Sequence, residues 1–238
     1  MRVMYGFAFS AAVAIAASSL ISAQAPAQPD GAVAVKGGGV FAKGWTGKVD
    51  ASEEKAGQVL NNAKLSQAAN GSLEVTTGPA TTYWNPANKA TGDYTVKATF
   101  TESNYMGLMD HPHPYGIVVG GNDLGTPTQS FLYCAAYGNG TFIVRGMGPE
   151  PFQMGGRRPE ANESVHKATG KGASVTQEIA VTVKGDSVSC AINGKTVGTY
   201  PKAEVVAAGK LKSTDGVYGI RFAHNTDATV SGLTMTKN

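Results

Sequence analysis

Two tyrosines and two arginines lie on predicted strands, at positions whose side chains could point to the same face of a sheet. Tyr133 and Tyr137 point to one side of the predicted strand Ser130–Tyr137, because side chains alternate between the two faces of a strand. Arg145 follows on the next predicted strand, and Arg221 lies on the penultimate one. Aromatic rings stack on the apolar faces of sugars, and a guanidinium donates several hydrogen bonds to hydroxyl or carboxylate groups. If these faces coincide, they line a carbohydrate-binding groove; otherwise the tyrosines are core residues and the arginines cover a sheet edge.

Two more side chains belong to this candidate ligand-binding set. His224 comes at the end of the penultimate predicted strand. Trp84 precedes Asn85-Pro86 and is expected either at the rim of the groove or in the core. The predicted ligand-binding residues are therefore Tyr133, Tyr137, Arg145, Arg221, His224 and Trp84.

The segment from 111 to 114 reads His-Pro-His-Pro and raises the question of a metal site. In an extended loop, His111 and His113 would direct two imidazoles to one side, where Asp110 or His224 would complete a ligand set. The two prolines instead favour a stiff, solvent-exposed loop, and we prefer that interpretation. A further alternative is a calcium ion bound by Asp123, Asn122 and loop carbonyls, because hard cations prefer oxygen ligands. Our expectation is that the protein has no cofactor.

The acidic residues are scattered along the sequence, which argues against glycoside hydrolysis. Glycoside hydrolysis needs two carboxyl groups at a defined separation. The candidates stand alone on their segments, and none forms an i, i+2 pair on a predicted strand: Glu74, Glu102, Asp110, Asp123, Glu150 and Glu178. A binding protein is therefore favoured over a two-carboxylate enzyme.

The two cysteines lie on predicted strands, each among apolar neighbours. Cys134 shares a face with Leu132 and Ala136, and Cys190 shares one with Val188 and Ile192. Both thiols should therefore face an apolar interior. They either form a disulfide or remain buried as small hydrophobic side chains.

Composition and pattern predict an all-β chain. The 238 residues include 31 glycines and 11 prolines, and only 16% are charged, which suits many short strands joined by tight turns. Alternation is clearest in Tyr94–Thr101, and glycine-containing turns such as Asn193-Gly194 separate the runs. These features predict an antiparallel two-sheet jelly-roll sandwich. The formal net charge is only +3, and the basic residues do not cluster in the sequence, so a nucleic-acid partner is not expected.

The N-terminus reads as an export signal. Arg2 precedes an apolar run from Phe7 to Ile21, and Ser22-Ala23 supply small residues for cleavage. The run is short for a transmembrane anchor, which is the alternative interpretation. We predict a signal peptide over residues 1–23, a flexible lead-in over 24–36 and a β-sandwich domain over 37–238. The mature protein would be periplasmic or extracellular, without a membrane span.

Several segments, in this order, resemble the concanavalin A-like lectin/glucanase sandwich in its laminin-G-like bacterial form. They are Gly92–Val96, Gly116–Asp123, Val188–Lys195, Gly216–Phe222 and Val230–Leu233. The resemblance covers most of the chain from about Trp45 onward. It implies a jelly-roll sandwich with a ligand surface on its concave sheet.

Within that superfamily, the chain looks most similar to exported bacterial domains related to 3-keto-disaccharide hydrolases. Such domains carry an acidic and arginine-containing strand pair, whereas the corresponding strand here reads Lys97-Ala98-Thr99-Phe100. The Glu-x-Asp-x-x-Glu strand of endoglucanases with this fold is also missing from the sequence. We therefore predict an exported carbohydrate-binding module. The alternatives are a glycoside or 3-keto-disaccharide hydrolase and a structural or adhesive envelope protein.

Overall fold

The computed structural model describes residue 1 and residues 31–238, and the chain from Gly31 to Asn238 forms one compact unit. The predicted signal peptide and the first part of the predicted lead-in fall on residues outside this range. Residues 31–36 were predicted as lead-in but contact the sandwich, since Val33 N–H donates to Asn225 Oδ1 at 2.8 Å and Val35 N–H to the Asn62 carbonyl at 2.9 Å. Within the described residues, no helix has the length and apolar character needed to cross a membrane.

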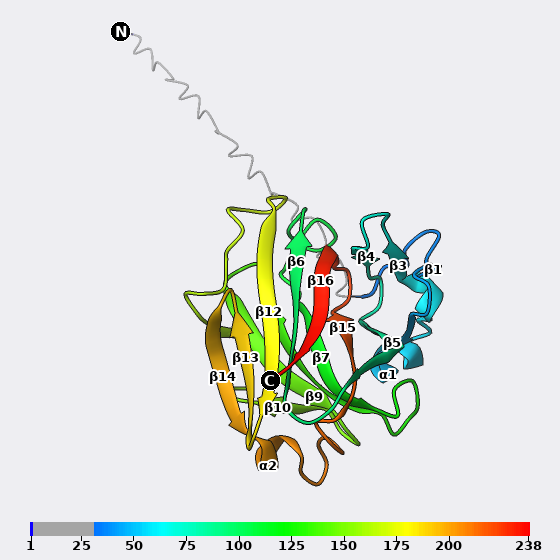
Figure 1. Ribbon diagram of the computed structural model, residues 1–238. Helices are drawn as coiled ribbons and strands as arrows, with labels where there is room; N and C mark the ends of the chain where they lie inside the picture. Colours follow the sequence, from blue (N-terminus) through cyan, green and yellow to red (C-terminus); the bar gives the residue numbers. More distant parts are fainter. Residues whose placement is uncertain (2–30) are drawn as a thin grey trace. The chain divides into compact units, whose positions relative to one another are not determined.

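Two large sheets make up the domain, as the sequence predicted (Figure 1). Sheet A contains, in spatial order, β1 (Gly39–Val40), β3 (Lys64–Gln67), β4 (Leu73–Thr76), β16 (Asp227–Lys237), β6 (Tyr94–Glu102), β12 (Val175–Lys184), β13 (Ser187–Ile192) and β14 (Lys195–Pro201). Sheet B contains β10 (Phe152–Met154), β9 (Thr141–Met147), β8 (Ser130–Ala136), β7 (Tyr115–Asn122), β15 (Gly216–Phe222), β5 (Thr81–Ala90) and β2 (Thr46–Val49), while β11 (Glu160–Ala161) also pairs with β9. Three single-turn helices complete the elements: α1 (Ala51–Lys55), η1 (Leu60–Asn62) and α2 (Lys202–Val205).

The main core lies between the two sheets and follows from strand alternation. On β6, Tyr94, Val96, Ala98 and Phe100 are buried, while the intervening threonines and lysine are more exposed. Sheet B contributes its own inward row, and the rings of Phe100 and Tyr115 stack across the interface at 5.5 Å. Burial of these alternate residues is the main stabilising term for the sandwich.

Turn chemistry sets the register of the outer strands of sheet A. Asn193 and Gly194 both adopt positive φ, at 50° and 79°, between β13 and β14. A type I′ hairpin requires this conformation at its two central positions, and asparagine and glycine tolerate it best. The predicted turn is confirmed.

Two segments differ from what their sequences favour. Pro86 favours the end of the strand that starts at Thr81, but β5 continues to Ala90. Pro86 is tolerated because the register against β15 is interrupted between Trp84 and Lys89, and β2 pairs with β5 only as far as Trp84. The segment 147–172 is rich in glycine, proline and charge, which favours a loop, but it holds the short strands β10 and β11, which both pair with β9.

The disulfide left open by the sequence is present. Cys134 on β8 and Cys190 on β13 are joined, with their Cα atoms 6.0 Å apart and a sequence separation of 56. Because β8 belongs to sheet B and β13 to sheet A, the bridge crosses the core and links the two layers.

Replacing both cysteines by alanine should lower the free energy of unfolding by about 4 kcal/mol, because the bridge restricts a long loop in the unfolded chain. Denaturant unfolding of the oxidised protein and of the Cys134→Ala/Cys190→Ala variant measures this difference. Reduced wild-type protein serves as the matched control. Equal midpoints for all three samples would contradict the prediction.

A buried acid at the end of β6 makes stability depend on pH. Glu102 is 5% exposed, accepts a hydrogen bond from the Met106 N–H at 3.2 Å, and has a second carboxyl oxygen without a partner among the described residues. Burial raises the pKa of Glu102 from 4.5 to about 7; the Met106 hydrogen bond opposes the shift, and Asp227 adds to it. The unfolded chain therefore ionises this group at lower pH than the folded chain does.

The contribution of Glu102 to stability should fall as pH rises from about 4.5 to about 7 and stay low above that range. Glu102→Gln keeps an acceptor for Met106 but carries no charge. The variant should therefore gain stability relative to wild type across this interval, on the order of 2–3 kcal/mol by pH 8. Urea unfolding of both proteins at pH 4, 6 and 8 measures the difference. A constant difference at all three pH values would count against a raised pKa.

Candidate functional site

A cavity of about 370 Å³ lies on the face of sheet B that points away from the main core. Its walls come from α1, from the loop before β7, from β8 and β9, and from the end of β15. The lining residues are Asp50, Glu53, Ala80, His111, Pro112, His113, Pro114, Tyr133, Ala135, Tyr137, Ile143, Arg145, Arg221, Ala223 and His224. Five of the six residues predicted to bind ligand are therefore brought together in one place.

Strand register explains why these side chains share a face. Tyr133 is paired with Arg145 on β9, and Gly116 is paired with both Ala135 and Arg221. All of these positions have the parity that points away from the main core. Ala135 lines the cavity with a short side chain, whereas at Gly116 the backbone of Cys134 and Ala135 fills the place of a Cβ atom.

Arg221 forms the floor of the cavity and is held by an acidic partner. Its guanidinium donates to both carboxylate oxygens of Asp50, at 2.7 and 2.5 Å, and to Thr82 Oγ1 at 3.0 Å. The Cζ atom lies 4.9 Å from the centre of the Tyr133 ring, which is a cation–π distance. Although burial disfavours the charge, the Asp50 carboxylate holds the pKa of Arg221 above its ordinary value. With 7% exposure for Arg221 and 6% for Tyr133, this layer is a rigid base beneath any ligand.

Tyr137 and Arg145 form the more accessible part of the cavity. Both are half-buried. Burial raises the pKa of Tyr137, and the positive charge of Arg145 opposes that shift. Arg145 Nε is buried and has no hydrogen-bond partner among the described residues, while Nη2 makes a long contact of 3.5 Å to the Arg157 carbonyl. That long contact is the one hydrogen bond from this guanidinium to the described residues.

Two acidic residues of the cavity were missed by the sequence analysis. Asp50 is the N-cap of α1 and Glu53 lies in its first turn. The Asp-x-x-Glu spacing at the start of a helical turn was the available signal, because residues three apart in a helix lie on the same side. The search for strand-based i, i+2 pairs could not detect it. Asp50 is committed to Arg221, whereas Glu53 Oε2 is buried without a hydrogen-bond partner among the described residues.

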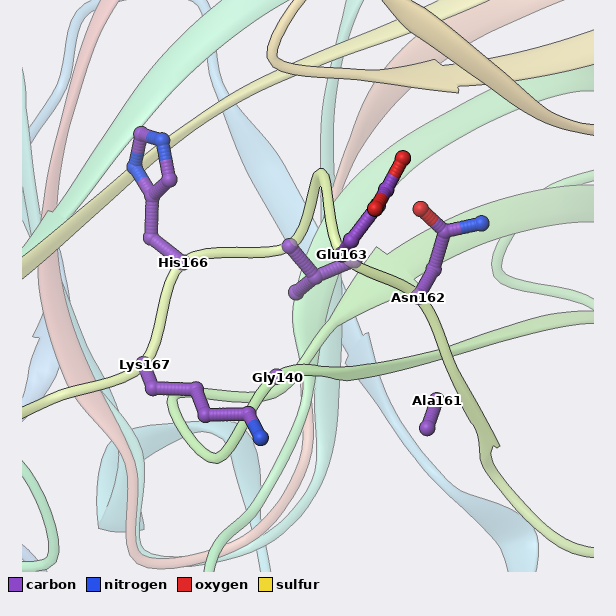
Figure 2. Close-up of a pocket in the computed structure, with 7 residues that line it drawn as sticks. Gly140, Ala161, Asn162, Glu163, His166 and Lys167 are labelled. Atoms are coloured by element: carbon purple, nitrogen blue, oxygen red, sulfur yellow. The ribbon is translucent and has the colours of Figure 1, made fainter.

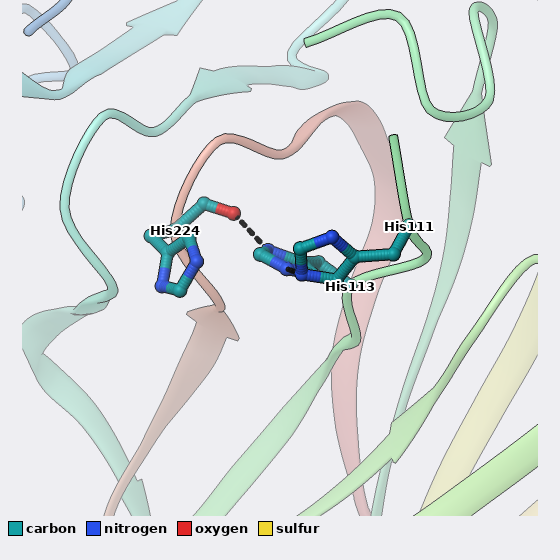
Figure 3. A group of neighbouring side chains, drawn as sticks. All are labelled: His111, His113 and His224. Carbon is teal, nitrogen blue, oxygen red and sulfur yellow. Dashed lines mark hydrogen bonds between the residues drawn. The ribbon is translucent and has the colours of Figure 1, made fainter. Parts of the chain in front are cut away.

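Three histidines gather at one side of the cavity (Figure 3). His111 and His113 come from the loop before β7, and His224 comes from the segment after β15. The ring centres of His113 and His224 are 4.2 Å apart, and those of His111 and His113 are 4.5 Å apart. Of the two side chains considered as a third metal ligand, His224 joins the group, whereas Asp110 pairs with Lys171 at 2.6 Å.

Two predicted site residues do not line the cavity. Trp84 is 6% exposed and lies on the same face of sheet B, where its ring packs close to Gly125. It is separated from Tyr133 by the neighbouring strands β15 and β7. Asp123 forms an ion pair with Lys212 and is not part of the histidine group.

A second hollow of about 670 Å³ lies between the turn at Gly140 and the segment 161–167 (Figure 2). Its lining consists of small, aliphatic and charged residues, including Glu163 and Lys167. His166 also lines this hollow, and its Nδ1 is hydrogen-bonded to the Thr176 carbonyl at 2.8 Å. No tyrosine, tryptophan or phenylalanine lines this hollow, so it is less suited to stacking against a sugar than the first cavity.

Known structures share this architecture. The carbohydrate-binding module CBM66 from Bacillus subtilis aligns with a TM-score of 0.51 and 9% identity, covering 84% of this chain and 99% of that chain. A Bacillus subtilis protein of unknown function with a galectin-like fold aligns with a TM-score of 0.54 and 12% identity, covering 82% and 90% of the two chains. An endo-β-1,3-glucanase from Pyrococcus furiosus aligns with a TM-score of 0.48 and 13% identity, covering 81% and 88%.

No protein-family model matches the sequence, and no curated protein sequence matches it either. Identities near 10% establish the fold alone. The two alignments with TM-scores above 0.5 cover more than four fifths of the chain, so the likeness concerns the sandwich as a whole. The chain is an all-β sandwich of two sheets, antiparallel except for the β1–β3 pair, which is the fold that the sequence resemblance implied.

Proposed function

We propose that the cavity on the outer face of sheet B binds a carbohydrate. The observation that carries this proposal is the arrangement of Tyr137 and Arg145, an accessible aromatic ring beside a guanidinium with unused donors. A buried donor without an acceptor costs free energy, and a sugar hydroxyl or a uronate carboxylate would satisfy it. The tyrosine ring would contact the apolar face of the same sugar.

The rest of the cavity supports this assignment. The Tyr133–Arg221–Asp50 layer is buried and held by short hydrogen bonds, so it would present a preorganised base to the ligand. A volume of about 370 Å³ falls within the range of small-molecule sites and suits a short saccharide. A carbohydrate-binding module has the same fold, and this analogy supports a saccharide as the ligand.

Export fits this function. The disulfide between Cys134 and Cys190 is a feature of proteins that fold in oxidising compartments. A periplasmic or extracellular location would bring the cavity into contact with cell-wall or environmental saccharides. The signal peptide inferred from the sequence supplies the route.

Glycoside hydrolysis is the second candidate, favoured by the presence of Asp50 and Glu53 in one cavity. Two carboxyl groups beside a bound sugar are the usual requirement for this reaction. The bidentate pairing of Asp50 with Arg221 weighs against it, because both oxygens of that carboxylate already accept hydrogen bonds. Glu53 is then the remaining candidate acid or base.

Tyr137→Ala and Arg145→Met should each weaken saccharide binding at least tenfold, or about 1.4 kcal/mol, because they remove the stacking surface and the free donors respectively. The measurement is calorimetric titration with the best ligand from a screen of neutral and uronic oligosaccharides. Arg158→Met, an exposed arginine outside the cavity, is the matched control and should bind like wild type.

Unchanged affinity in both cavity variants would refute this ligand site. Failure of every saccharide to bind folded wild-type protein would instead favour the structural or adhesive role.

Incubation with oligosaccharides and with a 3-keto-glycoside separates a binder from a hydrolase. A binding module releases no sugar. If sugar is released by the wild type and lost in Glu53→Gln, the hydrolase assignment replaces the binding one.

A further inference from the structure

We propose that His111, His113 and His224 bind one divalent transition-metal ion, for which Zn²⁺ is the fitting probe. One ring nitrogen of each residue belongs to a set of ligand atoms that all lie within 4.8 Å of one another. Figure 3 shows the three rings converging from two separate segments of the chain. The inference rests on these histidines and on Glu53, and it does not depend on which organic ligand the cavity binds.

Hydrogen bonds already orient the His113 ring. Its Nδ1–H donates to the backbone carbonyl of His224, and its Nε2 shares a hydrogen bond of 2.7 Å with His111 Nε2. An ion bound between the two Nε2 atoms would take the place of the proton in that hydrogen bond. Two nitrogens bound to one tetrahedral zinc ion at roughly 2.0–2.1 Å lie about 3.3 Å apart, so a small side-chain rotation admits the ion. A backbone carbonyl that holds the second nitrogen is a frequent feature of metal-binding histidines.

Glu53 supplies an independent second observation. Its Oε1 lies 3.3 Å from His224 Nδ1, and its Oε2 is buried without a hydrogen-bond partner among the described residues. A buried carboxylate oxygen that no donor satisfies is costly unless positive charge lies nearby. A divalent ion held by the adjacent imidazoles would supply that charge, and the carboxylate would also fix the orientation of the His224 ring.

The two segments that carry the histidines are held together by the backbone. Ala223 N–H donates to the Pro114 carbonyl at 2.9 Å, and this bond links the loop before β7 to the end of β15. Pro112 and Pro114 restrict the conformations of that loop. In the sequence, these prolines favoured an exposed loop without a metal. In the structure, the same restriction keeps the histidine ligands in position.

The donor set selects the class of ion. Imidazole nitrogens favour Zn²⁺ and its neighbours in the first transition series, whereas Ca²⁺ and Mg²⁺ prefer oxygen ligands. Both cysteines are consumed by the disulfide and offer no thiolate. Three imidazoles leave a fourth tetrahedral position for water or another oxygen ligand.

Zinc titration of the full chain, prepared without an affinity tag and stripped with EDTA, tests the site. Wild-type protein should bind one Zn²⁺ per chain, measured by calorimetry and by metal analysis after dialysis. His113→Gln and His224→Gln should lower the affinity at least tenfold, and Glu53→Gln should lower it roughly 10- to 100-fold. Co²⁺ should give the intense visible absorption of a four-coordinate ion in wild type and lose it in the histidine variants.

The matched control is His166→Gln, because His166 is the remaining histidine of the sequence and lies at the other hollow. It should bind zinc like wild type. His111→Gln guards against misfolding as an explanation, since His111 is exposed and its loss should weaken zinc binding while leaving the unfolding midpoint of the metal-free protein unchanged. The site is refuted if wild type binds no zinc, or if His113→Gln and His224→Gln bind it as tightly as His166→Gln does. No saccharide is present, so failure here leaves the sugar-binding proposal intact.

Discussion

The ion pair between Arg221 and Asp50 is the interaction on which the site depends. It spans 171 residues of sequence and joins the centre of sheet B to the start of α1. A guanidinium so deeply buried needs a hydrogen-bonded anion, because an unpaired charge in that position would cost several kcal/mol. Glu53 follows Asp50 by three residues in the first turn of α1, so the same contact places Glu53 at the wall of the cavity.

The cavity lies where other segments of the chain cover part of the outer face of sheet B. In the main core, apolar side chains of both sheets exclude polar groups, and the disulfide joins the layers. On the outer face of sheet B a smaller apolar cluster around Phe131 and Ile143 borders the charged and aromatic lining. The loop before β7 and the helix α1 then enclose this region, which converts a flat surface into a site with walls.

The fold does not decide the function. A fold shared at about 10% identity is compatible with many functions, so it leaves open whether this chain binds or transforms a ligand. The distinction rests on side chains. The binding proposal rests on Arg145, whose Nε has no hydrogen-bond partner among the described residues, and on an Asp50 held by Arg221. The metal proposal rests on three histidines beside Glu53, whose Oε2 has no hydrogen-bond partner in the same part of the chain.

The sequence by itself determined most of the strands and turns, and the parity that puts Tyr133, Tyr137, Arg145 and Arg221 on one face. These features are local, since alternation and positive-φ turns depend on near neighbours in the chain. Only the tertiary structure decided that the four side chains share a cavity, that His224 joins the His111 loop, and that Trp84 lies apart. Such contacts depend on strand order, and strands far apart in the sequence become neighbours without any local signal.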